Sequence, residues 1–355
     1  MVYQKNKNHF KLYLVIKSKL KIMLKFILKI LKYLGLTLSS AILIYLILLL
    51  FFPIEFSPTV DADSSLPSIT LNGHKFHSET FGNPKNQILI ALHGGPGGDY
   101  LSIRHLKELS SKYFVIMYDQ RMTGLSSRQS NVEITIQSFF DDLHSFINHY
   151  DNDKPVYIVG HSWGAMMASG YVGMHPEKVS KIVLIEPGIL KTELSEQYLN
   201  AGGPEIGFID YVNLSGAWLN KWRVNTDRDK DARNDYFKTM LYTYFRNKEY
   251  KNDFIGWRMG SSVARQTIGR LMRDPELLAS LDFLKGVENF DGDVLFLSSE
   301  YNKVYGVDYQ KQHLKYFKNA IEQMVPKTNH FIFIDQPDLS NKMIDEFFMG
   351  NTEKK

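Results

Sequence analysis

PVYIVGHSWGAMMASG, residues 155–170, is a short apolar run followed by a turn with two glycines and then by small residues and methionines. This order predicts a strand, a tight turn and a helix. Ser162 stands at the apex of the turn, where the backbone is strained and only small neighbours fit, and Gly160 and Gly164 are those neighbours. We therefore expect the serine hydroxyl to stand clear of the sheet and to face a substrate.

Composition restricts the kind of protein. The chain has 355 residues, of which 44% are hydrophobic and 23% charged, and this suits one large α/β domain with an insertion. It has no cysteine, which excludes disulfides, thiolate zinc sites and a cysteine nucleophile. The net charge is +4, but nine lysines and no acid lie in residues 1–52, so the remainder carries −5. We therefore expect no nucleic-acid partner, and no metal or cofactor.

Residues 33–52, YLGLTLSSAILIYLILLLFF, carry no charge. Twenty helical residues at about 1.5 Å each match a hydrocarbon core of about 30 Å, so this segment is predicted to be a transmembrane anchor that ends at Pro53. All nine lysines precede it, which predicts a single-pass protein with a cytoplasmic N-terminus and a catalytic domain on the non-cytoplasmic side. A cleaved signal peptide is the alternative, but the basic region is long and no A-x-A-like site follows. We favour an uncleaved anchor in the lipid bilayer.

Two short segments flank the anchor. In residues 1–32, four lysines recur every fourth residue on one stripe of a predicted amphipathic cytoplasmic helix: Lys17, Lys21, Lys25 and Lys29. This stripe either lies on an anionic leaflet or only sets the topology, and both interpretations stay open. Residues 53–67, which contain prolines, serines and aspartates, are predicted to be a linker.

Beyond the linker, short apolar runs alternate with helical patterns. Strands are expected at 69–72, 75–81, 87–92, 113–118, 156–159, 181–185, 293–298 and 321–325, and helices at 100–112, 135–150, 307–318 and 339–348. Such alternation predicts a parallel sheet with crossover helices, formed by residues 68–188 and 286–350. Residues 189–285 lose strand character and are rich in aromatic residues, which predicts a helical cap that walls the pocket and selects the substrate.

Three short motifs follow one another in this region: HGGPG at 93–97, DQR at 119–121 with Gly124 and Ser126, and GHSWG at 160–164. In this order and spacing they resemble the proline iminopeptidase-like branch of the α/β-hydrolase superfamily. The resemblance extends from about Ile69 to Phe348 and departs from the branch at Met122, where glycine is usual. It implies an α/β-hydrolase fold, a mostly parallel sheet flanked by helices, with a helical cap inserted after the sixth strand.

A serine nucleophile needs a base to take its proton and an acid to orient that base. His330 lies between the last predicted strand and the last helix, where the α/β-hydrolase order places the base. His161 is directed away by the turn, and His93 belongs to the glycine-rich loop. Three others of the eleven histidines fall in helical stretches, where solvated roles are expected: His144, His149 and His313.

The acid has three candidates. The family usually has aspartate after the seventh strand, but here Asn302 occupies that place and Glu300 stands two residues earlier. Asparagine can orient an imidazole but cannot balance its positive charge. Glu186, at the end of the sixth strand, resembles the acid position of haloalkane dehalogenases in the same superfamily. We prefer Glu186, with Glu300 as the alternative acid, and Asn302 stays open as an orienting group.

These residues predict a membrane-anchored serine hydrolase. Ser162 would attack a carbonyl, and the N–H groups of Trp163 and Gly95 would bind the oxyanion. The resemblance implies a small-molecule or short-peptide substrate with an N-terminal proline, whose ammonium needs acidic groups in the cap, and four are available there: Glu193, Glu196, Glu205 and Glu249. An esterase or amidase acting on small acyl substrates is the alternative. A further one is a catalytically inactive membrane-bound binding protein, since asparagine occupies the usual acid position. Epoxide hydrolases and dehalogenases are excluded because they need an aspartate nucleophile.

Overall fold

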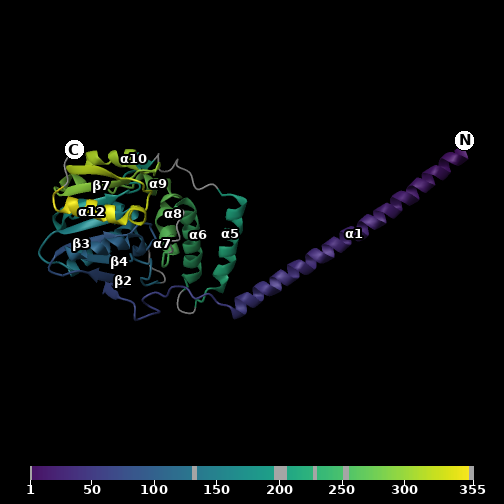
Figure 1. The fold of residues 1–355 in the computed structure, drawn as a ribbon, viewed down its shortest axis with the longest axis horizontal. Coiled ribbons are helices and arrows are strands. Elements are labelled where there is room, and N and C mark those ends of the chain that lie inside the picture. The colour runs from purple at the N-terminus through teal and green to yellow at the C-terminus, as the bar shows by residue number, and fades with distance from the viewer. Residues whose placement is uncertain (1, 130–133, 196–205, 227–229, 251–255, 352–355) are drawn as a thin grey trace. The chain divides into compact units, whose positions relative to one another are not determined.

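The computed structural model describes residues 2–129, 134–195, 206–226, 230–250 and 256–351. Contacts divide the chain into two units, Met1–Ile54 and Glu55–Lys355, and each is described by itself. The first is formed by helix α1 (Val2–Phe51), the purple rod of Figure 1. Its segment Ile16–Phe51 has the length and apolar composition of a membrane span, and a signal sequence near an N-terminus has the same character. The helix ends two residues before Pro53, which cannot continue it.

The second unit is built on one eight-stranded sheet with the order β1-β2-β4-β3-β5-β6-β7-β8. The strands are β1 (Ser68–Leu71), β2 (His74–Phe81), β3 (Gln87–Leu92), β4 (Tyr113–Tyr118), β5 (Val156–His161), β6 (Val179–Ile185), β7 (Asp293–Ser299) and β8 (Asn319–Val325). The β1–β2 and β2–β4 pairs are antiparallel, and every other pair is parallel. The predicted mostly parallel α/β fold is confirmed.

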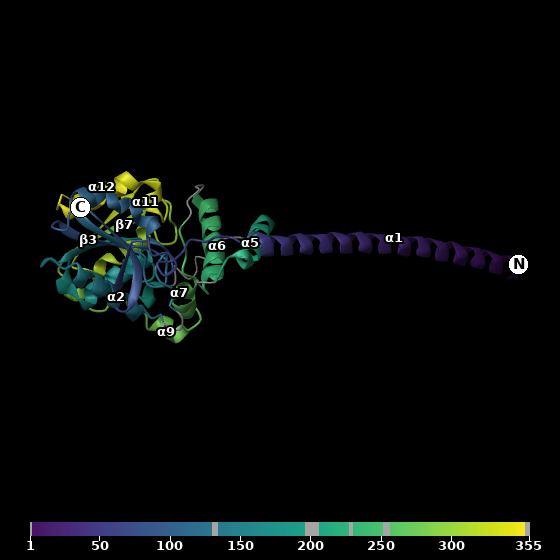
Figure 2. The same cartoon turned by 90° about the horizontal axis from the view of Figure 1, so that it is seen from below.

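The central strands are buried on both faces, which explains why their sequences are continuous apolar runs. Alternate residues of β3 point to opposite sides of the sheet, Ile88 and Ile90 into one hydrophobic core and Leu89 and Ala91 into the other. Helices α2 (Ile136–His149) and α3 (Trp163–Met174) cover the first core. Helices η1 (Tyr100–Ser111) and α12 (Pro337–Phe348) cover the second, and Figure 2 shows α2 and α12 on opposite sides of the sheet.

Two helical predictions differ from the structure. The predicted helix at 100–112 is the 3₁₀ helix η1, and the one predicted at 307–318 divides into α10 (Val307–Lys311) and the 3₁₀ turn η6 (Leu314–Tyr316). Further short elements are η2 (Pro176–Lys178), η3 (Thr192–Leu194), η5 (Val287–Asn289) and α11 (Ile332–Asp335). Within the predicted linker, Thr59 and Val60 are buried in the second unit, and the Val60 N–H donates to Leu125 O at 2.8 Å.

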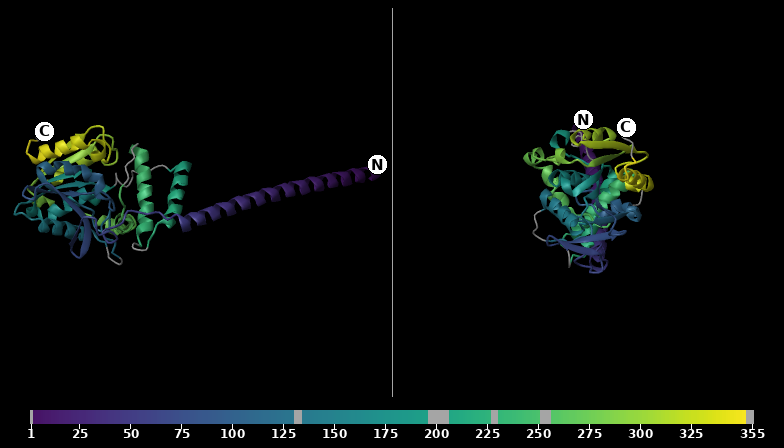
Figure 3. Two further views of the ribbon diagram at one scale, coloured as in Figure 1. Left: turned by 60° about the horizontal axis from the view of Figure 1, so that its bottom comes forward. Right: turned by 90° about the vertical axis from the view of Figure 1, so that its left-hand side faces the viewer.

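Between β6 and β7 the chain forms a group of helices at the place predicted for the cap. They are α5 (Phe208–Asn220), η4 (Lys221–Arg223), α6 (Ala232–Tyr250), α7 (Ser261–Gln266), α8 (Ile268–Leu271) and α9 (Pro275–Ala279). Figures 1 and 3 show α5 and α6 side by side at one end of the second unit. The Tyr244 hydroxyl of α6 donates to Asp210 of α5 at 2.6 Å and holds the two helices together.

Candidate active site

The turn between β5 and α3 has the geometry that its sequence predicts. Ser162 has φ 52° and ψ −112°, a backbone conformation that is rare for a residue with a side chain. Gly160 and Gly164 are required there, because a Cβ at Gly160 would lie 2.4 Å from Gly164 O and one at Gly164 would lie 2.2 Å from Leu92 O. The Ser162 N–H donates to Ile185 O at 2.8 Å, which fixes the turn against the end of β6.

His330 and Glu186 meet at the carboxyl edge of the sheet, which we define as the ends of β3, β5, β6 and β7 with the loops that follow them. The parallel pairing of β5, β6 and β7 aligns these ends. His330 Nδ1 lies 2.7 Å from Glu186 Oε2, and Glu186 is fully buried. With Nδ1 committed to Glu186, the nitrogen of His330 that remains for a nucleophile is Nε2.

The carboxylate of Glu186 accepts four hydrogen bonds. Oε1 accepts from the Ser299 N–H at 2.8 Å and from the Ser299 hydroxyl, while Oε2 accepts from Asn302 Nδ2 at 2.8 Å and from His330. A buried carboxylate without such donors would be costly, so this ring of donors explains how the group is held there.

The two other candidate acids, Glu300 and Asn302, have hydrogen-bond partners other than the imidazole. Glu300 is exposed, and its Oε2 accepts from the Lys327 N–H at 2.7 Å. Asn302 contacts the carboxylate of Glu186 rather than the imidazole, and its own oxygen accepts from the Val304 N–H at 3.0 Å. The structure thus brings Glu186 to His330, and it makes Asn302 a donor to that carboxylate.

Two further histidines are buried. His161 Nε2 lies 2.8 Å from the carbonyl oxygen of His330, and the two rings are 4.6 Å apart, so this side chain supports the loop that carries His330. Burial lowers the pKa of His161 well below its usual value, and the neighbouring His330 adds to this effect. The expectation of a solvated His313 is wrong. It is fully buried beside Phe296 and Tyr309, and burial lowers its pKa to about 4.

The three sequence motifs are joined by hydrogen bonds around Gln120. Its Nε2 donates to His93 O at 2.8 Å, its backbone N–H donates to His93 Nε2 at 3.0 Å, and its Oε1 accepts from Trp163 Nε1 at 3.0 Å. His93 Nδ1 in turn donates to Gly94 O at 2.8 Å. DQR therefore holds the glycine-rich loop and the nucleophile turn in one arrangement, which gives a physical reason for the three motifs occurring together.

The glycine-rich loop lies directly against Ser162. A Cβ on Gly94 would lie 3.2 Å from Ser162 Cβ, and Gly95 has φ 145°, which a residue with a side chain rarely adopts. Gly95 and Trp163, the two residues expected to bind an oxyanion, both line the same pocket as Ser162. Trp163 is the first residue of α3, where a helical N–H has no acceptor within the helix.

This pocket has an apolar wall supplied mainly by the cap. It encloses about 540 Å³, including space open to solvent, and none of its lining residues carries a charge in the part of the chain that the structure describes. The lining consists of Gly95, Pro96, Ser162, Trp163, Met166, Gly188, Ile189, Ile268, Leu271, Met272, Leu278, Leu281 and Tyr305. The Tyr305 ring packs edge-on against His330, with 4.5 Å between centroids.

The acidic groups expected to bind an ammonium are not found at this pocket within the described residues. Glu193 is exposed, and its carboxylate lies 3.3 Å from Lys191 Nζ. Glu196, Glu205 and the side chain of Glu249 lie outside the described residues. The ammonium of Lys238 from α6 is 3.2 Å from where a Cβ on Gly97 would be, and burial lowers its pKa to about 8.

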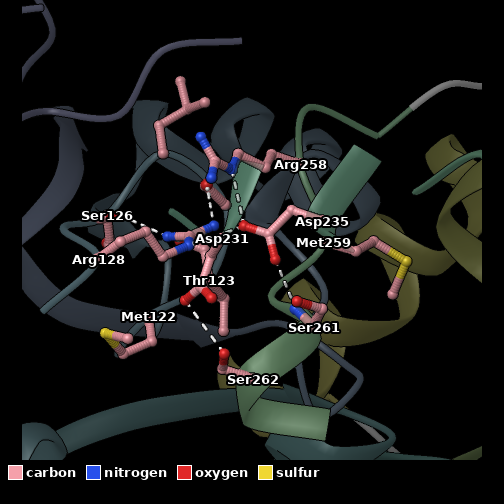
Figure 4. A network of polar contacts seen from close by, with 12 residues as sticks. Met122, Thr123, Ser126, Arg128, Asp231, Asp235, Arg258, Met259, Ser261 and Ser262 are labelled. Carbon is pink, nitrogen blue, oxygen red and sulfur yellow. Dashed lines mark hydrogen bonds and ion pairs between the residues drawn. The ribbon is translucent and has the colours of Figure 1, made fainter. Parts of the chain in front are cut away.

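A buried ionic network joins the cap to the core, and it was not predicted from the sequence (Figure 4). Asp235 of α6 accepts from Arg128 Nε at 3.0 Å and from Arg258 Nε at 2.9 Å, and its other oxygen accepts from the Ser261 N–H at 2.8 Å. Arg128 also donates to Gly124 O at 2.8 Å, in the loop that follows DQR. Burial alone would raise the pKa of Asp235, but the two arginines outweigh it, and the pKa is lowered.

Among the described residues no group of three His, Asp or Glu side chains suits a metal ion.

Comparison with known proteins identifies the family of this chain. A family model for the alpha/beta hydrolase fold matches residues 87–337. Over 207 residues, 58% of this chain and 60% of the relative, the sequence is 30% identical to a probable proline iminopeptidase of Leptolyngbya boryana. The chain spans less than two thirds of the length of the first curated relatives that it matches.

Solved structures share the fold at low sequence identity. A membrane phospholipase A described as a bacterial virulence factor has a TM-score of 0.57 and 16% identity, with 92% of this chain and 98% of that chain covered. A proline iminopeptidase of Mycobacterium smegmatis has a TM-score of 0.54 and 15% identity, with 80% of this chain and 97% of that chain covered.

Proposed function

Because this chain belongs to the alpha/beta hydrolase fold family, we propose that it is a serine hydrolase that works by acyl transfer. The observation that carries the proposal is the 2.7 Å contact between His330 Nδ1 and the buried Glu186 carboxylate, at the edge of the sheet where Ser162 occupies a strained turn. A base held by a buried acid, at the same edge of the sheet as such a serine, is the arrangement that activates a hydroxyl for attack on a carbonyl.

Each residue then has a role. Ser162 Oγ attacks the carbonyl carbon of the substrate, and His330 Nε2 takes the proton of the hydroxyl. Glu186 keeps the proton of the imidazole on Nδ1 and stabilises the imidazolium that forms. The N–H groups of Trp163 and Gly95 donate to the oxyanion. His330 returns the proton to the leaving group, and a water molecule releases the acyl group by the same steps.

The pocket favours an ester or amide of an apolar acyl group. Its lining is uncharged among the described residues, and an acyl chain there would gain about 0.8 kcal/mol for each buried methylene. A substrate ammonium would meet no carboxylate in that lining. Release of an N-terminal proline is the second candidate, and the name of the Leptolyngbya boryana relative favours it.

A fluorophosphonate probe tests the proposed chemistry in the full-length protein in membranes. We expect the probe to label the wild type and not the Ser162→Ala variant. A panel of acyl esters and a prolyl arylamide then separates the two candidate substrates. Absence of labelling in a folded wild-type protein would instead favour the inactive binding protein.

We further propose that α1 is an uncleaved anchor with its N-terminus in the cytoplasm. All nine lysines of residues 1–52 precede the apolar segment, which supports this orientation. Protease added to intact cells should digest an epitope placed after Pro53 and spare one placed before Lys32. Protection of the second unit would contradict the orientation.

A further inference from the structure

Helix α5 carries an apolar face that points into solvent. Six apolar residues on one side of the helix form it, with the exposed Ser215 between them, and we call them the α5 face: Phe208 (82% exposed), Tyr211 (60%), Val212 (54%), Trp218 (47%), Leu219 (41%) and Trp222 (42%), the last one just beyond the helix in η4. A helix on the surface of a soluble domain normally turns charged and polar residues to water. A contiguous exposed face of this kind marks a surface that binds something.

The fully buried residue of α5 is an aspartate, while Leu214 and Ala217 are half-buried. Asp210 is buried, accepts from Lys248 Nζ at 2.8 Å and receives the hydroxyl of Tyr244, both from α6. Polar contacts therefore attach α5 to the cap while its apolar residues face outward. The largest apolar side chains of α5 are therefore exposed rather than packed in the cap core.

The chain enters the second unit next to this helix pair. Phe56 packs edge-on against Tyr236 of α6, with 5.5 Å between centroids, and Ser57 O accepts from Arg258 Nη1 at 3.3 Å. Five residues lie between Phe51, the end of α1, and Ser57, and this length of chain spans at most about 20 Å when fully extended. An α1 that is inserted in a bilayer therefore keeps the end of α6 that carries Tyr236 within about this reach of the end of α1. Lys221 Nζ lies 5.6 Å from the ring of Phe237, so the end of the α5 face that carries Trp218 and Trp222 lies beside that end of α6.

The chemistry of the α5 face fits the boundary between lipid headgroups and acyl chains. Trp218, Trp222 and Tyr211 have apolar rings with a polar atom, and such residues concentrate at membrane interfaces. Lys221 Nζ lies 5.4 Å from the ring of Trp218 and 5.1 Å from that of Trp222, where it can meet a lipid phosphate. Phe208 is the most exposed of the set and would enter the acyl region.

We propose that the α5 face docks on the bilayer in which the chain is anchored, so that the enzyme takes acyl esters presented by the membrane. This inference rests on the proposed function, because it needs both the anchor and acyl transfer. The apolar pocket behind the cap would then receive the acyl chain of a lipid, and the α5 face would hold the cap at the surface from which the lipid comes.

The absence of cysteine allows a direct test in the full-length chain. An environment-sensitive fluorophore is attached to Phe208→Cys in vesicles of phosphatidylcholine and phosphatidylglycerol, with or without brominated acyl chains. Two other single-cysteine variants are controls: Ile44→Cys in α1, and Met349→Cys, which is 50% exposed and follows α12 on the side of the second unit away from α5 (Figures 1 and 2). We expect brominated lipid to lower the emission at 208 and 44 by at least about twofold and to leave 349 unchanged.

Each other outcome has a definite meaning. Quenching at 44 but not at 208 overturns the docking surface and leaves the anchored hydrolase intact. Loss of quenching at both overturns the anchor and the docking surface together. A blue-shifted emission at 208 that brominated lipid does not quench indicates cover by protein, such as a second copy of the chain, and also overturns the proposal.

A kinetic experiment tests the consequence for substrate. In Phe208→Ser/Trp218→Ser, hydrolysis of a long-chain acyl ester embedded in vesicles should fall by about tenfold, the effect of about 1.4 kcal/mol of lost apolar insertion. Hydrolysis of a short soluble ester should stay unchanged, because neither residue lines the pocket among the described residues. Equal rates on vesicles for variant and wild type would contradict delivery of substrate from the membrane.

Discussion

The carboxyl edge of the sheet and the cap hold their side chains by different forces. At the edge, Glu186 is fully buried and accepts from Ser299, Asn302 and His330. The cap instead presents apolar side chains of α8 and α9 to the pocket and exposes the α5 face. Hydrogen bonds are directional and apolar packing is not. Changes at the edge should therefore alter turnover by orders of magnitude, and changes in the cap should alter the choice among substrates.

The largest effect is expected for Glu186→Gln. Each carboxylate oxygen accepts two hydrogen bonds, so the NH₂ of glutamine must face either the two donors of Ser299 or those of Asn302 and His330. In both orientations the imidazole loses its charged partner, and in the second it also loses its preferred tautomer. We expect kcat to fall by about 10⁴, as when a triad acid becomes its amide. The measurement is steady-state hydrolysis of a soluble ester, with Ser162→Ala as the baseline.

Glu300→Gln is the matched control, because this exposed carboxylate contacts Lys327 rather than His330. Its kcat should stay close to that of the wild type. Thermal unfolding of Glu186→Gln shows whether the loss comes from the chemistry or from the fold. Near-wild-type turnover in a folded Glu186→Gln variant would refute its role as the acid.

The buried ion pairs of Asp235 attach the cap to the core, and removing them tests whether cap and core are energetically linked. Asp235→Asn removes the negative charge that Arg128 Nε and Arg258 Nε contact, and breaking a buried ion pair in this way costs about 3–5 kcal/mol of unfolding free energy. The melting temperature should fall sharply. In Asp291→Asn, which removes an exposed partner of Lys318, it should not change measurably.

The stability difference between the wild type and Asp235→Asn should also depend on pH. The pKa of Asp235 is lowered in the folded protein, so its stabilising contribution is present above the unfolded pKa and is lost as the pH falls through the folded value. The wild type and Asp235→Asn should therefore converge in strong acid and differ fully at neutral pH. A constant difference at all pH values would contradict an ionic role.

The edge and the cap also differ in how far the sequence predicts them. The bounds of β3 and β4 were predicted to the residue, because a strand buried on both faces leaves a continuous apolar run between polar residues. The acid was not decided, because it depends on the register that pairs Ile185 of β6 with Leu297 of β7, a contact between distant segments.

The ionic network of the cap left no signal in the sequence. Arg128 and Asp235 are 107 residues apart, and neither belongs to a motif with a recognisable spacing. Local patterns report the period of a helix or strand, whereas a buried ion pair is specified only once the tertiary fold brings its members together. The apolar outward face of α5 was likewise hidden, because the sequence alone does not say which side of a cap helix faces water.

A smaller effect at the edge is expected for Asn302→Asp. Asn302 donates to Glu186 Oε2, so aspartate would place a second carboxylate against the first, and like charges disfavour the ionised pair. We expect kcat at neutral pH to fall by about tenfold, the effect of roughly one pKa unit of unfavourable interaction. Asn302→Ala, which removes the donor without adding charge, should cost less. A rise in activity in Asn302→Asp would show that the acid belongs at the family's usual position.

The smallest expected effect lies in the cap and concerns substrate choice. Met272 lines the pocket and is 55% exposed, so glutamate can replace it without burying a charge. In the wild type, kcat/KM should rise by about fourfold for each methylene of the acyl chain until the pocket is filled, from about 0.8 kcal/mol per buried CH₂. In Met272→Glu this slope should flatten, because the carboxylate keeps water in the pocket, while the rate on a prolyl arylamide should rise because its ammonium gains a partner. Met349→Glu, equally exposed but outside the pocket lining, is the control and should leave both substrates unaffected. The contrary result has two parts: the wild type prefers the prolyl arylamide, and Met272→Glu leaves that preference unchanged. It would show that acidic groups beyond the described lining select the substrate and that the apolar wall has no part in specificity.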